Sequence, residues 1–237
     1  GNGDTNYAYF VLATNIDTVN MITNVVTNFF GSVMLGTGGI ADNGTLAFAQ
    51  PYASTLTNDI AGTGSVVLSG AGTLTILKGT ANTYSGGTTI SNSSLILAPT
   101  ASLSGQGLIN AINDLNQSGL GTGPITFLGT NSTLQMAWAD QQDPNAGVSP
   151  NFAYAINVPA GQSGTLWAQG RFDDNSVLTG GGTYNLGVNY VRGNFHGDWT
   201  GFTGQLNIIT NAVRTTGTST AYDFREFNAA GVPNAKV

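Results

Sequence analysis

The chain has 237 residues, of which 41% are hydrophobic and only 8% are charged, with 34 glycines and no cysteine. The hydrophobic share excludes intrinsic disorder, and six scattered Lys and Arg with a net charge of −6 exclude a nucleic-acid partner, whose phosphates need clustered cations. No apolar run reaches the roughly 18 residues of a membrane-spanning helix, so we expect no membrane span.

Residues 1–35 carry two competing patterns. Tyr7, Tyr9 and Val11 alternate as in a strand, whereas the apolar residues from Ile16 to Phe30 have a spacing closer to that of a helix. The Asn, Thr and β-branched residues between them are poor helix formers. Strands and an amphipathic helix both stay open, and either would serve as an N-terminal capping or assembly segment over the end of a solenoid.

From residue 36 to residue 134 the sequence contains a weak internal repeat. Gly-Thr-Gly occurs at 36–38, 62–64 and 121–123, and Thr-Leu follows at 45–46, 73–74 and 133–134. A further Gly-Thr-Leu stands at 164–166. We expect these motifs to occupy equivalent corners on successive turns of one repeated structure.

The stretch from Gly62 to Leu97 has short apolar runs that alternate with period two. The apolar pairs are Val66 with Leu68, Leu74 with Ile76, and Leu95 with Leu97. Strand, corner and strand, repeated without a helix between them, predict a chain that winds around itself. The glycines expected to supply the positive φ of its tight corners are Gly70, Gly72, Gly79, Gly86 and Gly87.

Three motifs in this stretch carry a family resemblance. They are GAGTLT at 70–75, ANTYSGGTTI at 81–90 and SLIL at 94–97. Together they resemble the autotransporter-associated β-strand repeat of bacterial surface and secreted proteins. The resemblance implies an all-β, right-handed parallel β-helix (β-solenoid) that is exported as part of a large extracellular or cell-surface protein. Leu77-Lys78-Gly79-Thr80 departs from the repeat, and we expect a longer corner there.

A short helix is predicted near residues 106–117 as an excursion from one corner. Leu108, Ile109, Ile112 and Leu115 fall on one helical face, residue 104 is a serine that can cap the start, and residue 119 is a glycine that can close the end. A polar loop follows at 140–150. Alternation then returns at Phe152, Tyr154, Ile156 and Val158, and again at Tyr184, Leu186, Val188 and Tyr190.

The run from Tyr190 to Gly204 also resembles a rung that follows such repeats in bacterial surface proteins. We find no linker that would divide the chain. We therefore expect one solenoid domain over residues 1–237, with rungs from 36 to 237. The end of the sequence after Pro233 shows no closing cap, which suggests an open rung that continues or stacks on another copy.

His196 is the only histidine, so a Ser-His-Asp triad would have to use it. Asp198 lies two residues away and would share its face of a strand. The sequence has no Gly-x-Ser-x-Gly elbow between a strand and a helix. We expect a surface or corner histidine.

Asp173 and Asp174 are adjacent, so on a strand they would face opposite ways and could not flank one glycosidic bond. A corner could instead bring them together with Asn175 as oxygen ligands for calcium. The only group that could imitate the carboxylate cluster and base of a polysaccharide lyase is Arg171, Asp173, Asp174 and Arg192, since Glu226 is the single glutamate. The alternative is a solvated acidic corner.

Other candidates are weaker. Gly180-Gly181-Gly182 lacks the strand, loop and helix context of a phosphate site. An isopeptide bond at Lys78 would need a nearby Asn or Asp and a buried acid. The tryptophans could stack on sugar rings if they lined one exposed face, and would otherwise cover the core; they are Trp138, Trp167 and Trp199.

No residue therefore receives a catalytic, cofactor-binding or metal-binding role, and we expect a protein that is not an enzyme. The sequence favours an extracellular or bacterial cell-surface β-solenoid with a structural or adhesive function. Copies of it could associate end to end as a head-to-tail fibre or filament. The alternative is a carbohydrate-binding or polysaccharide-cleaving β-helix with extracellular glycans as partners.

Overall fold

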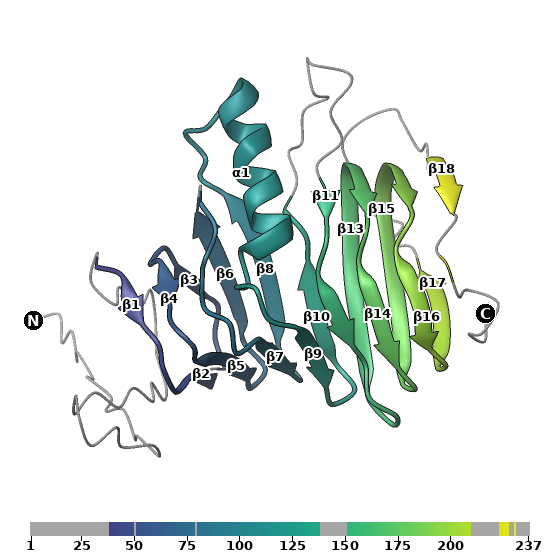
Figure 1. Ribbon diagram of the computed structural model, residues 1–237, viewed down its shortest axis with the longest axis horizontal. Coiled ribbons are helices and arrows are strands. Elements are labelled where there is room, and N and C mark those ends of the chain that lie inside the picture. Colours follow the sequence, from purple (N-terminus) through teal and green to yellow (C-terminus); the bar gives the residue numbers. More distant parts are fainter. Residues whose placement is uncertain are drawn as a thin grey trace, which may run out of the picture.

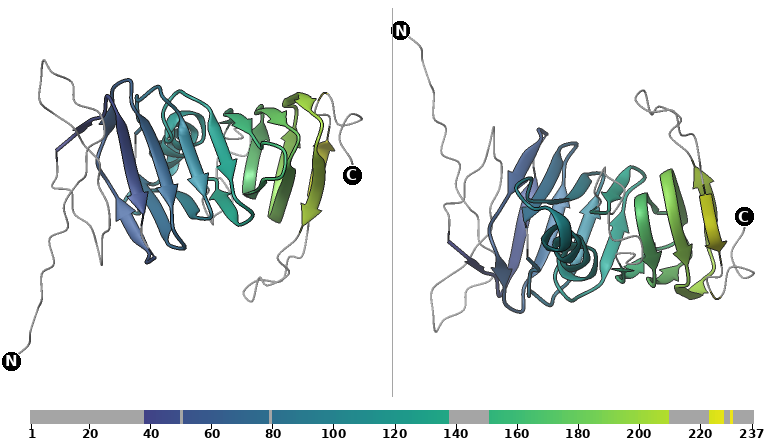
Figure 2. Two further views of the ribbon diagram at one scale, coloured as in Figure 1. Left: turned by 90° about the horizontal axis from the view of Figure 1, so that it is seen from below. Right: turned by 90° about the horizontal axis from the view of Figure 1, so that it is seen from above.

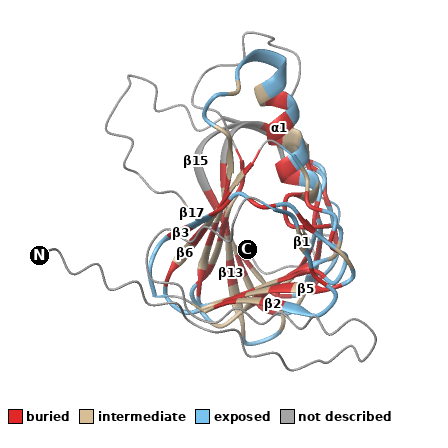
Figure 3. Cartoon of the chain, turned by 90° about the vertical axis from the view of Figure 1, so that its left-hand side faces the viewer, coloured by how far each residue is buried: buried red, intermediate tan, exposed pale blue. Residues whose placement is uncertain are grey.

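Parallel strands wound into a β-solenoid of about seven turns make up the protein (Figure 1). The structure is a computed structural model that describes residues 38–49, 51–78, 80–137, 151–209, 223–227 and 230. The strands of successive turns lie side by side along the long axis in two further views (Figure 2). Seen along this axis, the turns enclose a narrow interior that is lined by buried residues (Figure 3).

Three parallel sheets form the sides of the solenoid. One has nine strands: β3 Ser54–Leu56, β6 Thr73–Lys78, β8 Ser94–Pro99, β10 Ser132–Gln135, β13 Ser163–Asp174, β15 Thr183–Phe195 and β17 Gln205–Ile209, with β11 Asn151–Phe152 paired to β13 and β18 Asp223–Phe227 paired to β15. The second has seven: β2 Thr45–Ala49, β5 Ser65–Ser69, β7 Thr88–Ser91, β9 Ile125–Leu128, β12 Ala155–Asn157, β14 Val177–Gly180 and β16 Asp198–Phe202. The third pairs β1 Ile40–Ala41 with β4 Ile60–Ala61.

The core consists of apolar side chains stacked from turn to turn. In the nine-stranded sheet one inward position is leucine on five successive strands; this leucine ladder is Leu74, Leu95, Leu134, Leu166 and Leu186, and it continues to Ile208. Its five leucines are at most 2% exposed. Each apolar position is thus covered by the same position of its neighbours, as the period-two pattern predicts.

The strands expected from residues 152–158 are confirmed. All four apolar residues of that alternation are buried, namely Phe152, Tyr154, Ile156 and Val158. The second alternation falls on β15, where Tyr184 and Leu186 are fully buried.

The helix α1 Gly105–Ser118 projects from the solenoid between β8 and β9, as the sequence predicts (Figure 1). Ile109, Ile112 and Leu115 are buried on its inner face. Ser104 is the N-cap residue by backbone position, but its side chain makes no capping hydrogen bond, and Gly119 closes the helix in a right-handed conformation.

Two buried side chains attach α1 to the turns beside it. Asn116 Nδ2 donates to the carbonyl oxygen of Ala137 at 3.0 Å, and the N–H of Ala137 donates to Asn116 Oδ1 at 2.8 Å. The Tyr154 hydroxyl donates to the carbonyl oxygen of Leu115 and accepts from the N–H of Leu120. Since an unpaired buried amide or hydroxyl is costly, these contacts fix where the chain leaves and rejoins the solenoid.

The corner glycines behave only partly as expected. Gly70 and Gly87 have positive φ, whereas Gly72 and Gly86 do not. Gly86 is required by close approach instead, because a Cβ there would lie 2.5 Å from the carbonyl oxygen of Gly64. Gly79 lies outside the described residues.

The two later copies of the internal repeat occupy equivalent corners, but these corners are two turns apart and not on successive turns. Gly62 and Gly121 both have positive φ just before strands of the seven-stranded sheet, and the threonines of the later Thr-Leu motifs share one ladder, namely Thr73, Thr133 and Thr165. The prediction is wrong for Thr45, which lies on the other sheet opposite Ser65. Sequence spacing alone does not distinguish the two sheets, since both begin a strand after a glycine corner.

The expected segment 1–35, the loop 140–150 and the end of the chain after Pro233 lie outside the described residues. Among the described helices, none is long and apolar enough to cross a membrane.

Candidate functional site

The two adjacent aspartates face opposite sides of β13. Asp174 is fully buried in the interior, while Asp173 lies on the outer side and accepts a hydrogen bond from Asn194 Nδ2 at 2.8 Å. The prediction that they cannot flank one bond is confirmed. The calcium hypothesis is wrong, because the corner does not join the two carboxylates and Asn175 bonds to Asn151 instead.

The lyase-like group is not assembled around one groove either. Arg171 and Arg192 are register partners on β13 and β15, but their side chains lie outside the described part of the structure. Asp174, the second carboxylate of that group, is enclosed in the core. Among the described residues, no three His, Cys, Asp or Glu side chains are arranged to hold a metal ion.

Asp174 occupies an unusual polar position inside the solenoid. Its Oδ1 accepts the N–H of Ser176 at 2.7 Å, while its Oδ2 and the hydroxyl of Tyr184 are buried without a hydrogen bond in the described part of the chain. Burial raises the pKa of Asp174 to about 6, against the lowering influence of Ser176 and His196. Burial also raises the pKa of Tyr184, and the charge of Asp174 raises it further. The sequence does not reveal this buried acid, since its neighbour Asp173 is just as polar.

His196 lies at the corner between β15 and β16, where Asp198 begins the next strand, so the two residues do not share one strand face. Both are exposed, and the expected surface or corner histidine is confirmed. The Asp198 carboxylate accepts from the N–H and hydroxyl of Thr200, and the hydroxyl bond is the main reason why its pKa is lowered. Ser176, which is near in sequence to Asp174, is fully buried and its hydroxyl accepts from Trp199 Nε1 at 3.2 Å. A serine enclosed in this way is not placed to attack a substrate.

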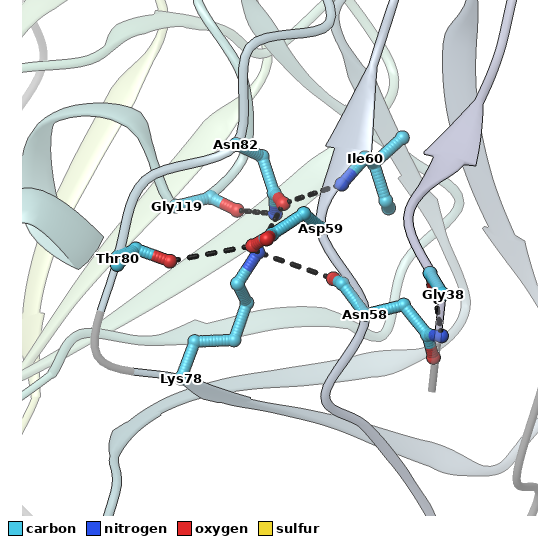
Figure 4. A network of polar contacts seen from close by, with 8 residues as sticks. All are labelled: Gly38, Asn58, Asp59, Ile60, Lys78, Thr80, Asn82 and Gly119. Atoms are coloured by element: carbon cyan, nitrogen blue, oxygen red, sulfur yellow. Dashed lines mark hydrogen bonds and ion pairs between the residues drawn. The ribbon is translucent and has the colours of Figure 1, made fainter. Parts of the chain in front are cut away.

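Lys78 lies at an inward position of β6 with its side chain only 2% exposed (Figure 4). The longer corner expected at Leu77 and Lys78 is therefore wrong, because β6 includes both residues. The ammonium group donates to the carbonyl oxygen of Asn58 at 3.1 Å and to Asn82 Oδ1 at 2.6 Å, and it forms an ion pair with Asp59. A buried lysine needs such partners, because an unpaired buried charge is very costly.

Asn82 extends this network to the next turns. Its Oδ1 also accepts the N–H of Ile60 at 2.9 Å, and its Nδ2 donates to the carbonyl oxygen of Gly119 at 2.6 Å. The two residues Lys78 and Asn82 thus connect backbone groups from Asn58 to the end of α1 (Figure 4). We call this set the lysine clamp: Asn58, Asp59, Ile60, Lys78, Asn82 and Gly119.

The clamp meets one requirement of an isopeptide bond and fails another. Asn82 and Asp59 both contact the Lys78 amine. However, the Asp59 side chain is 69% exposed, and its bond to Lys78 lowers its pKa, whereas the chemistry needs a buried acid that holds a proton. The geometry is that of a noncovalent clamp between turns.

Hydroxyl and amide side chains form a second ladder on the outer face of the nine-stranded sheet. This outer polar ladder consists of Thr73, Ser94, Thr133, Thr165, Asn185 and Asn207. Thr133 donates to Ser94 at 2.7 Å, Asn185 to Thr165 at 3.2 Å, and Asn207 to Asn185 at 2.8 Å. The stacking of polar side chains follows from parallel pairing in register, which places like positions above one another.

The tryptophans do not line one exposed face. Trp199 is buried and Trp138 lies outside the described residues, whereas Trp167 is half-buried on the outer face of β13, beside the outer polar ladder. The glycines 180–182 join β14 to β15, so no helix follows them and the context of a phosphate site is missing, as expected.

No family model, no curated protein and no solved structure matches the chain.

Proposed function

We propose that the chain serves as a rigid structural or adhesive β-solenoid, without enzymatic activity, in an extracellular or cell-surface bacterial protein. The observation that carries this proposal is the leucine ladder, which runs without interruption through five successive strands of the nine-stranded sheet. A rod stabilised at every turn by the same stacked contacts resists bending and keeps its two ends apart. Such a property suits a spacer, an adhesin passenger or a fibre subunit.

Two further features support an exported role. Residues 70–97 resemble the autotransporter-associated β-strand repeat, and the outer polar ladder consists of hydroxyls and amides rather than ions. With charged residues at 8%, solvation of this rod depends on neutral polar groups. The uncharged outer polar ladder also agrees with an adhesive partner that carries hydroxyl groups.

End-to-end association is the form of assembly that the terminal strands favour. β17 is the last strand of its sheet path, and Ile208, which continues the leucine ladder, is 48% exposed. A further strand stacked on β17 would cover this side chain and would pair the edge hydrogen-bonding groups. We propose that β3 of a second copy provides that strand.

Electron microscopy of the purified protein at several concentrations tests the proposal. Rods that join into regular fibres, with an axial repeat close to one subunit length, are the expected result for a fibre subunit. Dispersed single rods would contradict end-to-end assembly and leave the spacer or adhesin role. Compact particles without a long axis would contradict the structural role itself.

A further inference from the structure

Trp167 forms a flat aromatic surface on the outside of the solenoid. It alternates along β13 with the buried residues Leu166 and Ala168, so its side chain belongs to the outer face. Its register partner on β15 is Gly187, where a Cβ would lie only 2.2 Å from Trp167 Cε3 and 2.5 Å from Cζ3. The six-membered ring therefore covers the Gly187 backbone, and Gly187 is buried although it faces outward. The indole packs on this backbone, and the Trp167 side chain is half-buried.

Neutral polar groups lie directly beside the ring. Thr165 and Asn185 occupy the row two residues back along the same two strands, about 6.6 Å away, and Asn207 follows on the next strand, about 4.8 Å further on. Asn185 Nδ2 donates to Thr165 and to Ser163, and its Oδ1 accepts from Asn207. These bonds hold the amides in fixed positions and leave lone pairs on the hydroxyl and amide oxygens for a ligand.

The charge of this surface narrows the class of ligand. In the rows beside the indole whose side chains the structure describes, the outward side chains are hydroxyl, amide and apolar groups: Ser163, Thr165, Thr183, Asn185, Gln205, Asn207, Gln135 and Ile209. An anionic or cationic ligand would lose its hydration shell here without gaining a counter-charge. A neutral sugar ring has an apolar C–H face for the indole and hydroxyls that exchange hydrogen bonds with amides.

We propose that this surface, formed by Trp167, Thr165, Asn185 and Asn207, binds a neutral polysaccharide chain, with one sugar ring stacked on Trp167. The inference rests on the proposed adhesive role and gives that role a ligand class. The repeat of turns continues the polar row along the axis, so neighbouring sugar units would meet the same kind of hydroxyl and amide groups. Gly187 acts as a positioning residue, because any larger side chain would displace the indole from the sheet.

Isothermal titration calorimetry with hexasaccharides of glucan, mannan, xylan and galactan tests this proposal, and oligogalacturonate serves as the anionic comparison. We expect at least one neutral hexasaccharide to bind and oligogalacturonate not to bind. Trp167→Ala should weaken that binding at least tenfold, while Trp167→Phe, which keeps a smaller ring, should weaken it less. Thr75→Ala is the matched control, since it removes an outward side chain from the same row of the sheet three strands away and should leave binding unchanged.

Circular dichroism and electron microscopy of each variant separate loss of the site from loss of the rod. The proposal is overturned if none of the neutral hexasaccharides binds, or if Trp167→Ala binds as well as the unchanged protein while both form rods. It is also overturned if Trp167→Ala changes only self-association, which would assign the surface to a second copy of the chain. Absence of rods in the unchanged protein would contradict the proposed structural function and not the ligand class.

Discussion

At the residue scale, the charge of Lys78 lies inside the solenoid wall, unlike that of a typical surface lysine. Its three partners are Asn58, Asn82 and Asp59. Two of these partners are buried, so they lose their hydrogen bonds when the amine is removed. Asp59 is mostly exposed and regains water at little cost. We therefore expect that the clamp stabilises the fold mainly through the hydrogen bonds of Lys78 to Asn58 and Asn82, and little through the ion pair with Asp59.

Lys78→Met keeps most of the side-chain volume and removes all three donors. We expect it to lower the free energy of unfolding by about 1–3 kcal/mol, because two buried acceptors, the carbonyl oxygen of Asn58 and Oδ1 of Asn82, each lose a charged hydrogen-bond donor. Asp59→Asn, the matched control at the exposed partner, should change it by at most about 1 kcal/mol. Urea unfolding curves with unchanged slope measure both values. An equal loss of stability in the two variants would contradict this explanation, because the ion pair with Asp59 would then account for the stabilisation.

Asp174 predicts a pH dependence with a definite sign. Its pKa in the folded chain is about 6, above the ordinary value of 3.8, so the folded state binds the proton more tightly than the unfolded state. The associated stabilisation is complete below the ordinary value and is lost as the pH rises through about 6. A shift of this size corresponds to a few kcal/mol, at roughly 1.4 kcal/mol per pKa unit.

Asp174→Asn removes this titration and keeps the shape of the side chain. As the pH rises from about 4 to about 7, the unchanged protein should lose stability relative to this variant, because only the unchanged protein must ionise a buried carboxyl. The urea midpoint of the variant should therefore rise relative to that of the unchanged protein. Asp173→Asn is the control for the loss of a carboxylate from the outer face of the same strand. A difference for Asp174→Asn that does not change with pH would mean that this carboxyl is not sealed in the core.

At the element scale, the strands and the helix were predictable because their signals are local. The pairs Val66 with Leu68 and Leu95 with Leu97 show the period of a strand, and Ile109, Ile112 and Leu115 show that of a helix. The resemblance then supplied the parallel winding, which local periodicity does not contain. Positions such as Thr45 were misplaced because a glycine corner precedes strands of both large sheets.

The sites were less predictable because they depend on contacts between turns. Lys78 meets Asn58 and Asn82 only after the chain has completed a turn, and nothing in Leu77-Lys78-Gly79 distinguishes an inward lysine from one at a corner. The same holds for Trp167, whose orientation depends on a glycine one turn further along. The surroundings of both side chains depend on which residues of neighbouring turns lie opposite one another. The periodicity of a single sequence does not contain this register.

The helix α1 offers a direct test at this scale. Gly107 lies within it on the exposed side, and a Cβ there would have no atom within 4 Å. Gly107→Ala should therefore stabilise the protein by about 0.5–1 kcal/mol through the lower entropy of the unfolded chain. Gly119→Ala is the opposing control, since its Cβ would lie 2.7 Å from the carbonyl oxygen of Leu115 and should destabilise. Thermal unfolding measures the stability of both variants. A loss of stability in Gly107→Ala would contradict the assignment of this segment as a helix.

At the scale of the whole molecule, the solenoid repeats one stacking contact and then stops. Along the leucine ladder each side chain is covered on both sides, until Ile208 on β17 is left 48% exposed. At the other end of the same sheet path, Ser54 and Leu56 on β3 are buried. The two ends are therefore unlike, which suits a polar, head-to-tail contact rather than a symmetric dimer.

Ile208→Asp tests whether this end is the contact. A junction formed on β17 would bury the new carboxylate without a counter-charge, which is costly. We therefore expect no fibres or oligomers at concentrations at which the unchanged protein forms them. The melting temperature should fall by only a few degrees, because the side chain it replaces is nearly half exposed. Val177→Asp is the matched control: Val177 is 44% exposed on β14, which pairs with a strand on each side and therefore offers no open edge. If both variants abolish assembly equally, added negative charge is the cause, and β17 loses its assignment as the junction between copies.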